Sequence, residues 1–182
     1  MGDWKMTWYR HGGFALAAAV LLLAGCGSGG MDLVVDEARL AFSPKAAFVT
    51  PNASGGHSID ITNYPVQMGE SYDYRKMRAT KEGQYRLELV LVKAAANGTR
   101  PLATGEYRPQ PHNQTPRDKL VRVTLFGVVD GRDQRLAELD YARFTSGRVE
   151  ILSVQDGVAR GRIEASGIPL TVSGEFEARL LR

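Results

Sequence analysis

The sequence predicts an all-β fold: an antiparallel β-sandwich or a partly open barrel that ends in a meander of hairpins. Hydrophobic and polar residues alternate with a period of two in several segments, and turn signals separate these segments. No convincing amphipathic helix interrupts them. With 182 residues, of which 43% are hydrophobic and 24% are charged, the chain can bury the core of one ordinary domain. We therefore expect a single antiparallel β-domain over residues 31–182.

The first half of this domain is the less regular one. Ile59 and Ile61 alternate with polar neighbours, and Tyr85 is followed by leucine at every second position up to Leu91. Shorter strands are expected at 32–36, 38–42 and 46–50. Residues 50–57 and the proline-rich stretch 108–119 have the composition of loops. The only weak helix candidate is the segment 71–80.

From residue 119 to the end, the pattern predicts a meander of five strands. The turn signals are Asp130-Gly131, Ser146-Gly147, Asp156-Gly157 and Ser166-Gly167. Asp-Gly pairs adopt positive φ readily and favour tight hairpins. The adjacent apolar pair Ile151-Leu152 breaks the alternation and indicates a β-bulge. The last segment alternates most cleanly, and Ile168 is expected on its apolar face.

The first 26 residues follow a different pattern. Lys5 and Arg10 precede an apolar run at 14–23, which is too short to span a bilayer and is typical of the hydrophobic part of a signal peptide. The next residues are Leu23-Ala24-Gly25-Cys26, and Cys26 is the only cysteine of the chain. These four residues resemble the lipobox of bacterial lipoproteins. The glycine-spaced hairpins over 147–176 also resemble those of many β-rich bacterial lipoproteins, which implies a fold and not an activity.

The lipobox resemblance implies where the protein works. Residues 1–25 would be cleaved as a signal peptide, and Cys26 would carry a diacylglycerol on its sulfur and an acyl chain, such as palmitate, on its amino group. Two or three acyl chains hold a protein firmly on a membrane. Residues 26–30 would then form a short Gly/Ser tether on the extracytoplasmic side. Gly27 replaces the aspartate that retains such proteins at the inner membrane, which favours the periplasmic face of the outer membrane in a two-membrane source.

Composition and motifs lower the rank of several function classes. The 23 basic residues are interleaved with 20 acidic ones for a net charge of +3, so no nucleic-acid surface is expected. The spacings of His57 and His112 do not match a zinc site, and the aspartates at 130, 133 and 140 do not form a calcium loop. Phosphate-binding, dinucleotide-binding and serine-hydrolase motifs are absent. We expect no metal, no cofactor and no catalytic residue.

One segment has the composition of a contact surface. Between residues 64 and 78, aromatic and cationic side chains are interleaved outside any clean strand. Tyrosine and arginine are enriched at binding hot spots, and such a loop could stack on a sugar or contact anionic groups. In the alternative, the tyrosines close one end of the fold and the basic residues stay solvated. The candidate ligand or partner contacts are Tyr64, Tyr72, Tyr74, Arg75, Lys76 and Arg78.

These observations favour a non-enzymatic binding or accessory module of the bacterial cell envelope. It would be anchored to a membrane by lipid and would contact an envelope protein or a glycan. The alternatives are a structural subunit of an envelope complex, a hydrolase whose site is concealed in the fold, and a carrier of an apolar ligand inside a closed barrel.

Overall fold

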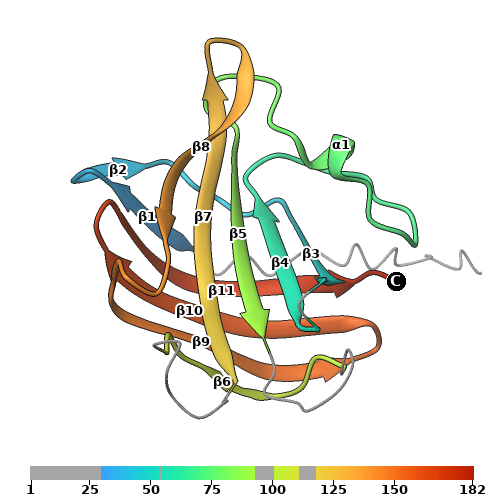
Figure 1. The fold of residues 1–182 in the computed structure, drawn as a ribbon. Coiled ribbons are helices and arrows are strands. Elements are labelled where there is room, and N and C mark those ends of the chain that lie inside the picture. The colour runs from blue at the N-terminus through green and yellow to red at the C-terminus, as the bar shows by residue number, and fades with distance from the viewer. Residues whose placement is uncertain (1–29, 54, 93–100, 111–117) are drawn as a thin grey trace, which may run out of the picture.

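The structure is a computed structural model that describes residues 30–53, 55–92, 101–110 and 118–182. Within these ranges the chain is almost entirely β-structure, which confirms the predicted fold class (Figure 1). The elements are β1 (Met31–Val35), β2 (Ala38–Leu40), β3 (Ala46–Pro51), β4 (His57–Thr62), α1 (Tyr74–Met77), β5 (Tyr85–Val92), β6 (Gly105–Tyr107), β7 (Lys119–Val129), β8 (Arg132–Leu139), β9 (Phe144–Gln155), β10 (Val158–Gly167) and β11 (Leu170–Leu180).

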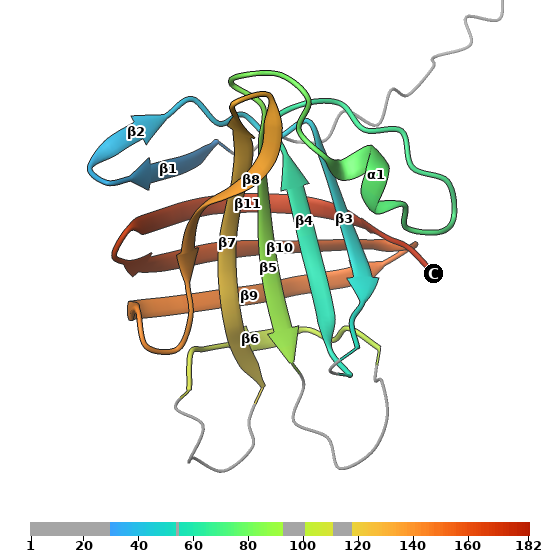
Figure 2. The same ribbon diagram turned by 45° about the horizontal axis from the view of Figure 1, so that its top comes forward.

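All of these strands join in one curled sheet. Its order is β6-β9-β10-β11-β3-β4-β5-β7-β8, with β1 added to β11 and β2 to β1. The pairing is antiparallel except at the junction of β11 and β3, where Arg179 and Leu180 pair in parallel with Phe48 and Val49. Figures 1 and 2 show β9, β10 and β11 crossing behind β3, β4, β5 and β7 at a steep angle. Because β6 and β8 stand at opposite ends of the strand order, the sheet is a partly open barrel.

The core lies inside this curl and follows the predicted alternation. Every second residue of the central strands is buried, among them Ile59, Ile61, Leu87, Leu89, Val123 and Leu125, and Ile163 and Val172 meet them from the opposite layer. Burial of one such side chain stabilises the fold by about 1.5–3 kcal/mol. The remaining residues of β3, β4, β5 and β7 therefore project from the outer face of the sheet.

The bulge and the hairpin turns at Asp130-Gly131 and Asp156-Gly157 are confirmed, whereas Ser166-Gly167 lies inside β10 and the turn follows at residues 168–169. Asp130 and Gly131 have φ of 50° and 71°, and Asp156 and Gly157 have φ of 52° and 74°. Both pairs form tight turns, between β7 and β8 and between β9 and β10. The pairing of β10 with β9 shifts between Arg160 and Gly161, which leaves Leu152 without a cross-strand partner in the ladder.

The predicted turn at Ser146-Gly147 is wrong, because both residues lie inside β9. Gly147 is required there for close packing, since a Cβ at this position would lie 2.7 Å from Cγ of Pro109. The actual turn spans residues 140–143. It carries the chain from one end of the strand order to strands near the other end, so the predicted five-stranded meander divides into the hairpin β7–β8 and the three-stranded meander β9–β11.

The remaining sequence predictions concern Ile168, the short elements β6 and α1, and two sites outside the described residues. Ile168 is 83% exposed and not on the buried face, because β11 begins only at Leu170, after a proline that cannot donate to the ladder. The three-residue strand β6 was not predicted, although Tyr107 within it is fully buried. The weak helix candidate at 71–80 contains the single turn α1. Asn97-Gly98 and His112 lie outside the described residues.

A candidate ligand-binding pocket

Charged and aromatic residues form ordered rows on the outer face of the sheet. The register places Asp60 of β4 directly opposite Glu88 of β5, and Glu88 opposite Thr124 of β7. In the neighbouring row, Arg86 of β5 stands opposite Phe126 of β7. Two carboxylates are thus cross-strand neighbours, with an arginine beside each of them. Like charges in this arrangement repel unless cations compensate them.

The two arginines compensate the carboxylates in different environments. Arg86 donates from Nη1 to Oδ1 of Asp60 at 2.7 Å, and both side chains are only 2% exposed. Arg122 donates from Nη2 to Oε2 of Glu88 at 3.3 Å, with 43% of the arginine and 19% of the glutamate side chain exposed. The pair Asp60–Arg86 is therefore buried, whereas the pair Glu88–Arg122 borders solvent.

Burial perturbs the titration of this cluster. It raises the pKa of Asp60, although Arg86 and a hydrogen bond from Tyr72 act in the opposite direction. Burial also raises the pKa of Glu88, and the nearby charge of Asp60 adds to this effect. The pKa of Tyr72 is raised because the ring is buried and Asp60 disfavours a second negative charge. The phenol of Tyr72 is therefore a hydrogen-bond donor at neutral pH, and it donates to Oδ2 of Asp60 at 3.1 Å.

The segment between β4 and β5 covers part of this outer face. Its anchor is Met77, which is fully buried against Phe48, Met68 and Leu181 in a small second core. Tyr64 donates from its hydroxyl to the backbone oxygen of Met77. Asp73 caps α1 by accepting from the backbone N–H of Arg75 at 3.0 Å. These contacts fix the segment on the sheet and place Tyr72 and Tyr74 over the charged rows.

Sheet and segment together line an open pocket of about 340 Å³. Its base is the guanidinium of Arg86, which stacks on the ring of Phe126 at 3.9 Å, while the ring of Tyr74 lies 5.2 Å away. Hydroxyls, carboxylates, guanidinium groups and aromatic rings all reach it. The lining residues are Thr50, Ser58, Asp60, Tyr72, Tyr74, Arg86, Glu88, Arg122 and Phe126. A pocket that offers donors, acceptors and ring faces fits a polar ligand.

The residues proposed from the sequence separate into three groups. Tyr72 and Tyr74 line the pocket, and Tyr74 is 49% exposed. Tyr64 is buried and holds the segment instead of facing a ligand. The third group, Arg75, Lys76 and Arg78, is exposed at α1 and just after it and does not line this pocket.

Sequence reasoning missed the strand residues of the site, above all Asp60, Arg86, Glu88 and Arg122. Each occupies a polar position in a strand of alternating apolar and polar residues, and such positions usually face solvent. The burial of Arg86 arises because the segment 63–84 returns over the sheet, and this contact is not encoded in strand periodicity. The only sequence signal was that charged residues adjoin apolar ones in two consecutive predicted strands, with Asp60 between Ile59 and Ile61 and Arg86 before Leu87.

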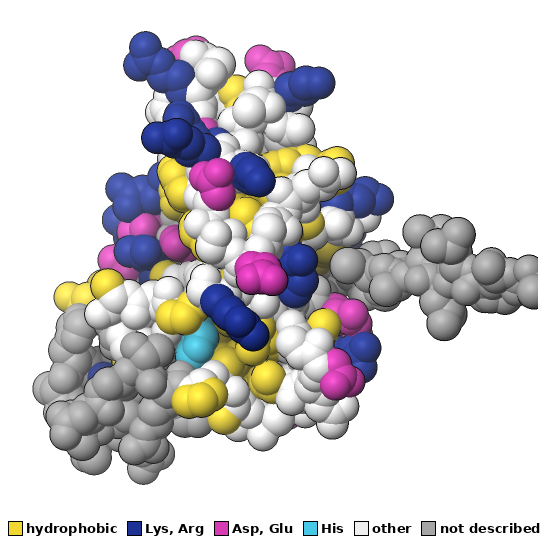
Figure 3. Space-filling model, turned by 90° about the vertical axis from the view of Figure 1, so that its right-hand side faces the viewer, with side chains coloured by type: hydrophobic (Ala, Val, Ile, Leu, Met, Phe, Trp, Pro, Cys, Tyr) yellow, Lys and Arg dark blue, Asp and Glu magenta, His cyan; other side chains and the backbone are white. Residues whose placement is uncertain are grey.

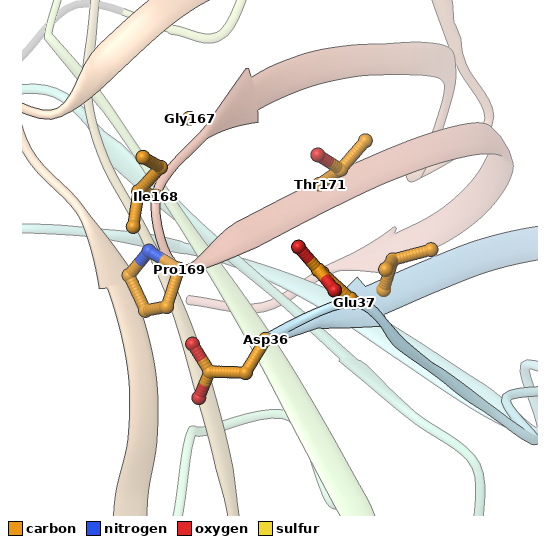
Figure 4. Close-up of a pocket in the computed structure, with 7 residues that line it drawn as sticks. Asp36, Glu37, Gly167, Ile168, Pro169 and Thr171 are labelled. Carbon is orange, nitrogen blue, oxygen red and sulfur yellow. The ribbon is translucent and has the colours of Figure 1, made fainter.

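Another pocket, of about 370 Å³, lies where the β1–β2 turn meets the β10–β11 turn (Figure 4). Asp36 and Glu37 lie beside Pro169 and Ile168 there, and the backbone N–H of Asp36 donates to the carbonyl of Pro169 at 3.0 Å. No buried charge faces this pocket in the described part of the chain. Its chemistry is therefore less specific than that of the Arg86 pocket.

Surface charge, metal-ligating side chains and membrane-spanning helices give no further candidate site among the described residues. On the side shown in Figure 3, basic and acidic side chains are interspersed. Among the described residues, no group of three or more histidine, cysteine or acidic side chains could hold a metal ion. The same residues contain no helix with the length and hydropathy needed to cross a bilayer. Cys26 and the other residues that resemble a lipobox lie outside the described residues.

Comparisons with known proteins give no relative from which a role could be transferred. No protein-family model matches the chain, no curated protein matches it, and no solved structure matches it. The function of this protein is therefore inferred from its pocket and its sequence.

Proposed function

We propose that this protein is a lipid-anchored binding module of the bacterial cell envelope whose Arg86 pocket takes a glycan. The observation that carries the proposal is the pocket itself: hydroxyl, carboxylate and guanidinium groups surround a half-exposed tyrosine ring. Sugars present hydroxyls that both donate and accept, and C–H faces that pack on aromatic rings. The lipobox at Leu23–Cys26 supports a membrane anchor, and the tether at 26–30 would keep the pocket close to that membrane.

The arrangement favours binding over hydrolysis. Asp60 is held by Arg86 and Tyr72 and is 2% exposed, so it has little freedom to exchange a proton with a substrate. Glu88 is the more accessible carboxylate, but Arg122 engages it. A glycosidase needs two carboxyl groups that both reach the scissile bond. Fixed polar groups around an aromatic ring instead serve recognition.

The anchor has a direct test in cells. Replacement of Cys26 by alanine is expected to leave an uncleaved precursor without acyl chains, and the replacement Ser28→Ala is the matched control within the tether. Mass spectrometry of the membrane fraction after a high-salt wash would show both changes. A Cys26→Ala protein that is still cleaved and still sediments with membranes would contradict the anchor.

The ligand class has a separate test in vitro. The detergent-solubilised protein is mixed with insoluble peptidoglycan sacculi, and the bound fraction is measured after sedimentation. We expect Tyr74→Ala to weaken retention about tenfold, because loss of an aromatic hot spot costs more than about 1 kcal/mol. The matched control is Tyr141→Ala, which removes another exposed tyrosine outside this pocket. Equal retention of both variants, or no retention of the unchanged protein, would refute the glycan proposal.

A further inference from the structure

Arg86 uses only part of its hydrogen-bonding capacity. Its Nη1 donates to Asp60, but its Nε and Nη2 are buried and have no hydrogen-bond acceptor among the described residues. A guanidinium carries five N–H donors, and the N–H groups of Nε and Nη2 point from the same edge of its plane. The unused donors therefore form one fork. A buried charged group whose donors lack acceptors is unusual, since buried polar groups are nearly always hydrogen-bonded.

A fork of two parallel N–H donors has a specific complement. It matches the two oxygens of a carboxylate, which accept one hydrogen bond each. Arg86 already pairs with one carboxylate through its other terminal nitrogen, since Nη1 donates a single hydrogen bond to Oδ1 of Asp60. A neutral hydroxyl offers one oxygen and satisfies only one of the two donors.

The carboxylates nearest to this fork have other partners and do not accept hydrogen bonds from it. Asp60 is engaged on the other edge, and Glu88 is engaged by Arg122. The ring of Phe126 fixes the plane of the guanidinium at 3.9 Å. The ring of Tyr74 lies 5.2 Å from the guanidinium and is half exposed on α1. Because the two free donors are buried, the binding proposed below requires Tyr74 to move when a ligand enters.

We propose that the Arg86 pocket binds a carboxylate-bearing sugar, whose carboxylate pairs with Nε and Nη2 of Arg86 while its ring lies against Tyr74. This inference rests on the proposed function and adds the acidic group of the ligand to it. Thr50, Ser58 and Glu88 line the same pocket and would supply polar contacts to the hydroxyls of the sugar.

The test compares two sugars that differ by one acidic group. N-acetylmuramate and N-acetylglucosamine share a ring and an acetamide, but only the former carries a lactyl carboxylate. Each is titrated into the detergent-solubilised protein, with acetate as the minimal probe. Binding is followed through the side-chain Nε–H resonances of the arginines and through thermal stability, which rises when a ligand binds the native state. We expect N-acetylmuramate to bind about 10- to 100-fold more tightly, because hydrogen bonds to a charged group are strong.

Variants locate the effect. Arg86→Lys keeps a positive charge for Asp60 but removes the fork, and it should abolish the preference for the acidic sugar. Arg160→Lys is the matched control on an exposed arginine of β10, and it should retain the preference. Circular dichroism establishes that each variant is folded. If Arg86→Lys does not fold, the resonance shifts and the two-sugar comparison on the unchanged protein still decide the question.

The outcomes separate the two proposals. Equal affinity for both sugars would overturn the carboxylate inference and leave the glycan function standing. A response to acetate without a response to either sugar would overturn the inference that the acidic ligand is a sugar, and retention on sacculi would decide the glycan function. No response to any of the three probes would overturn the inference, and retention on sacculi would then decide the function independently.

Discussion

The buried pair of Asp60 and Arg86 predicts a large and specific loss of stability. In Asp60→Asn the side chain keeps its shape and an oxygen that can accept from Tyr72, but the charge that balances Arg86 is gone. Because both side chains are 2% exposed and their atoms lie 2.7 Å apart, the arginine would remain charged in a desolvated site. Breaking such a pair costs about 3–5 kcal/mol. For a domain of this size that corresponds to a fall of roughly 6–20 °C in Tm.

Guanidinium chloride unfolding followed by circular dichroism measures this loss. The matched control is Glu177→Gln, which breaks the exposed pair with Arg160 and should cost about 0–1 kcal/mol. The double replacement Asp60→Leu with Arg86→Met should be less destabilising than Asp60→Asn, because it removes both charges together. If Asp60→Asn costs no more than the exposed control, the pair does not hold the outer face as we describe.

Three further predictions concern the segment, the bulge and pH. Met77→Ala should destabilise the fold by about 2–5 kcal/mol and increase amide exchange over 63–84, since Met77 is fully buried beneath this segment; unchanged exchange there would contradict its role. Gly161→Ala should cost about 1–3 kcal/mol in thermal unfolding, because a Cβ would lie 2.5 Å from the carbonyl oxygen of Glu150 and 2.6 Å from Cζ of Phe176; a neutral effect would contradict this packing. The raised pKa of Glu88 means that the folded state binds this proton more tightly than the unfolded state, so the free energy of unfolding should fall as pH rises from about 4.3 through the folded pKa. Glu88→Gln should flatten this part of the profile, although the charges of Arg122 and Arg86 partly oppose the shift; an identical profile in the variant would show that Glu88 is not perturbed.

Local pattern was sufficient for much of the fold. Alternation located β4, β5, β7 and β11 because one face of each strand is buried in the core, and Asp130-Gly131 and Asp156-Gly157 set hairpins because both residues adopt positive φ. The same reasoning failed at Ser146-Gly147, where the glycine accommodates Pro109 and not a turn. Turn chemistry and close packing require the same residue, and only the tertiary contact distinguishes them.

The site was predictable only in its aromatic half. Tyr72 and Tyr74 stood out because they lie outside clean strands among basic residues. Arg86 did not, because an arginine on the polar phase of a strand is ordinary, and its burial depends on a segment that folds back over the sheet. Tyr64 was wrongly interpreted, because it lies in the same segment of interleaved aromatic and basic residues and was expected to contact a ligand. Its hydroxyl instead donates to the backbone oxygen of Met77 and holds the segment in place.

In-cell photo-crosslinking tests most directly whether the Arg86 pocket is the ligand site. A photoreactive amino acid replaces Tyr74 at the mouth of the pocket, and in the control it replaces Leu152, which is 51% exposed on β9 and does not line this pocket. After irradiation, the purified protein is analysed by mass spectrometry for adducts. We predict a saccharide adduct at position 74 that is absent at position 152 and is lost when Arg86→Lys is combined with the probe. Equal labelling at both positions, or none at position 74, would contradict the assignment of this pocket.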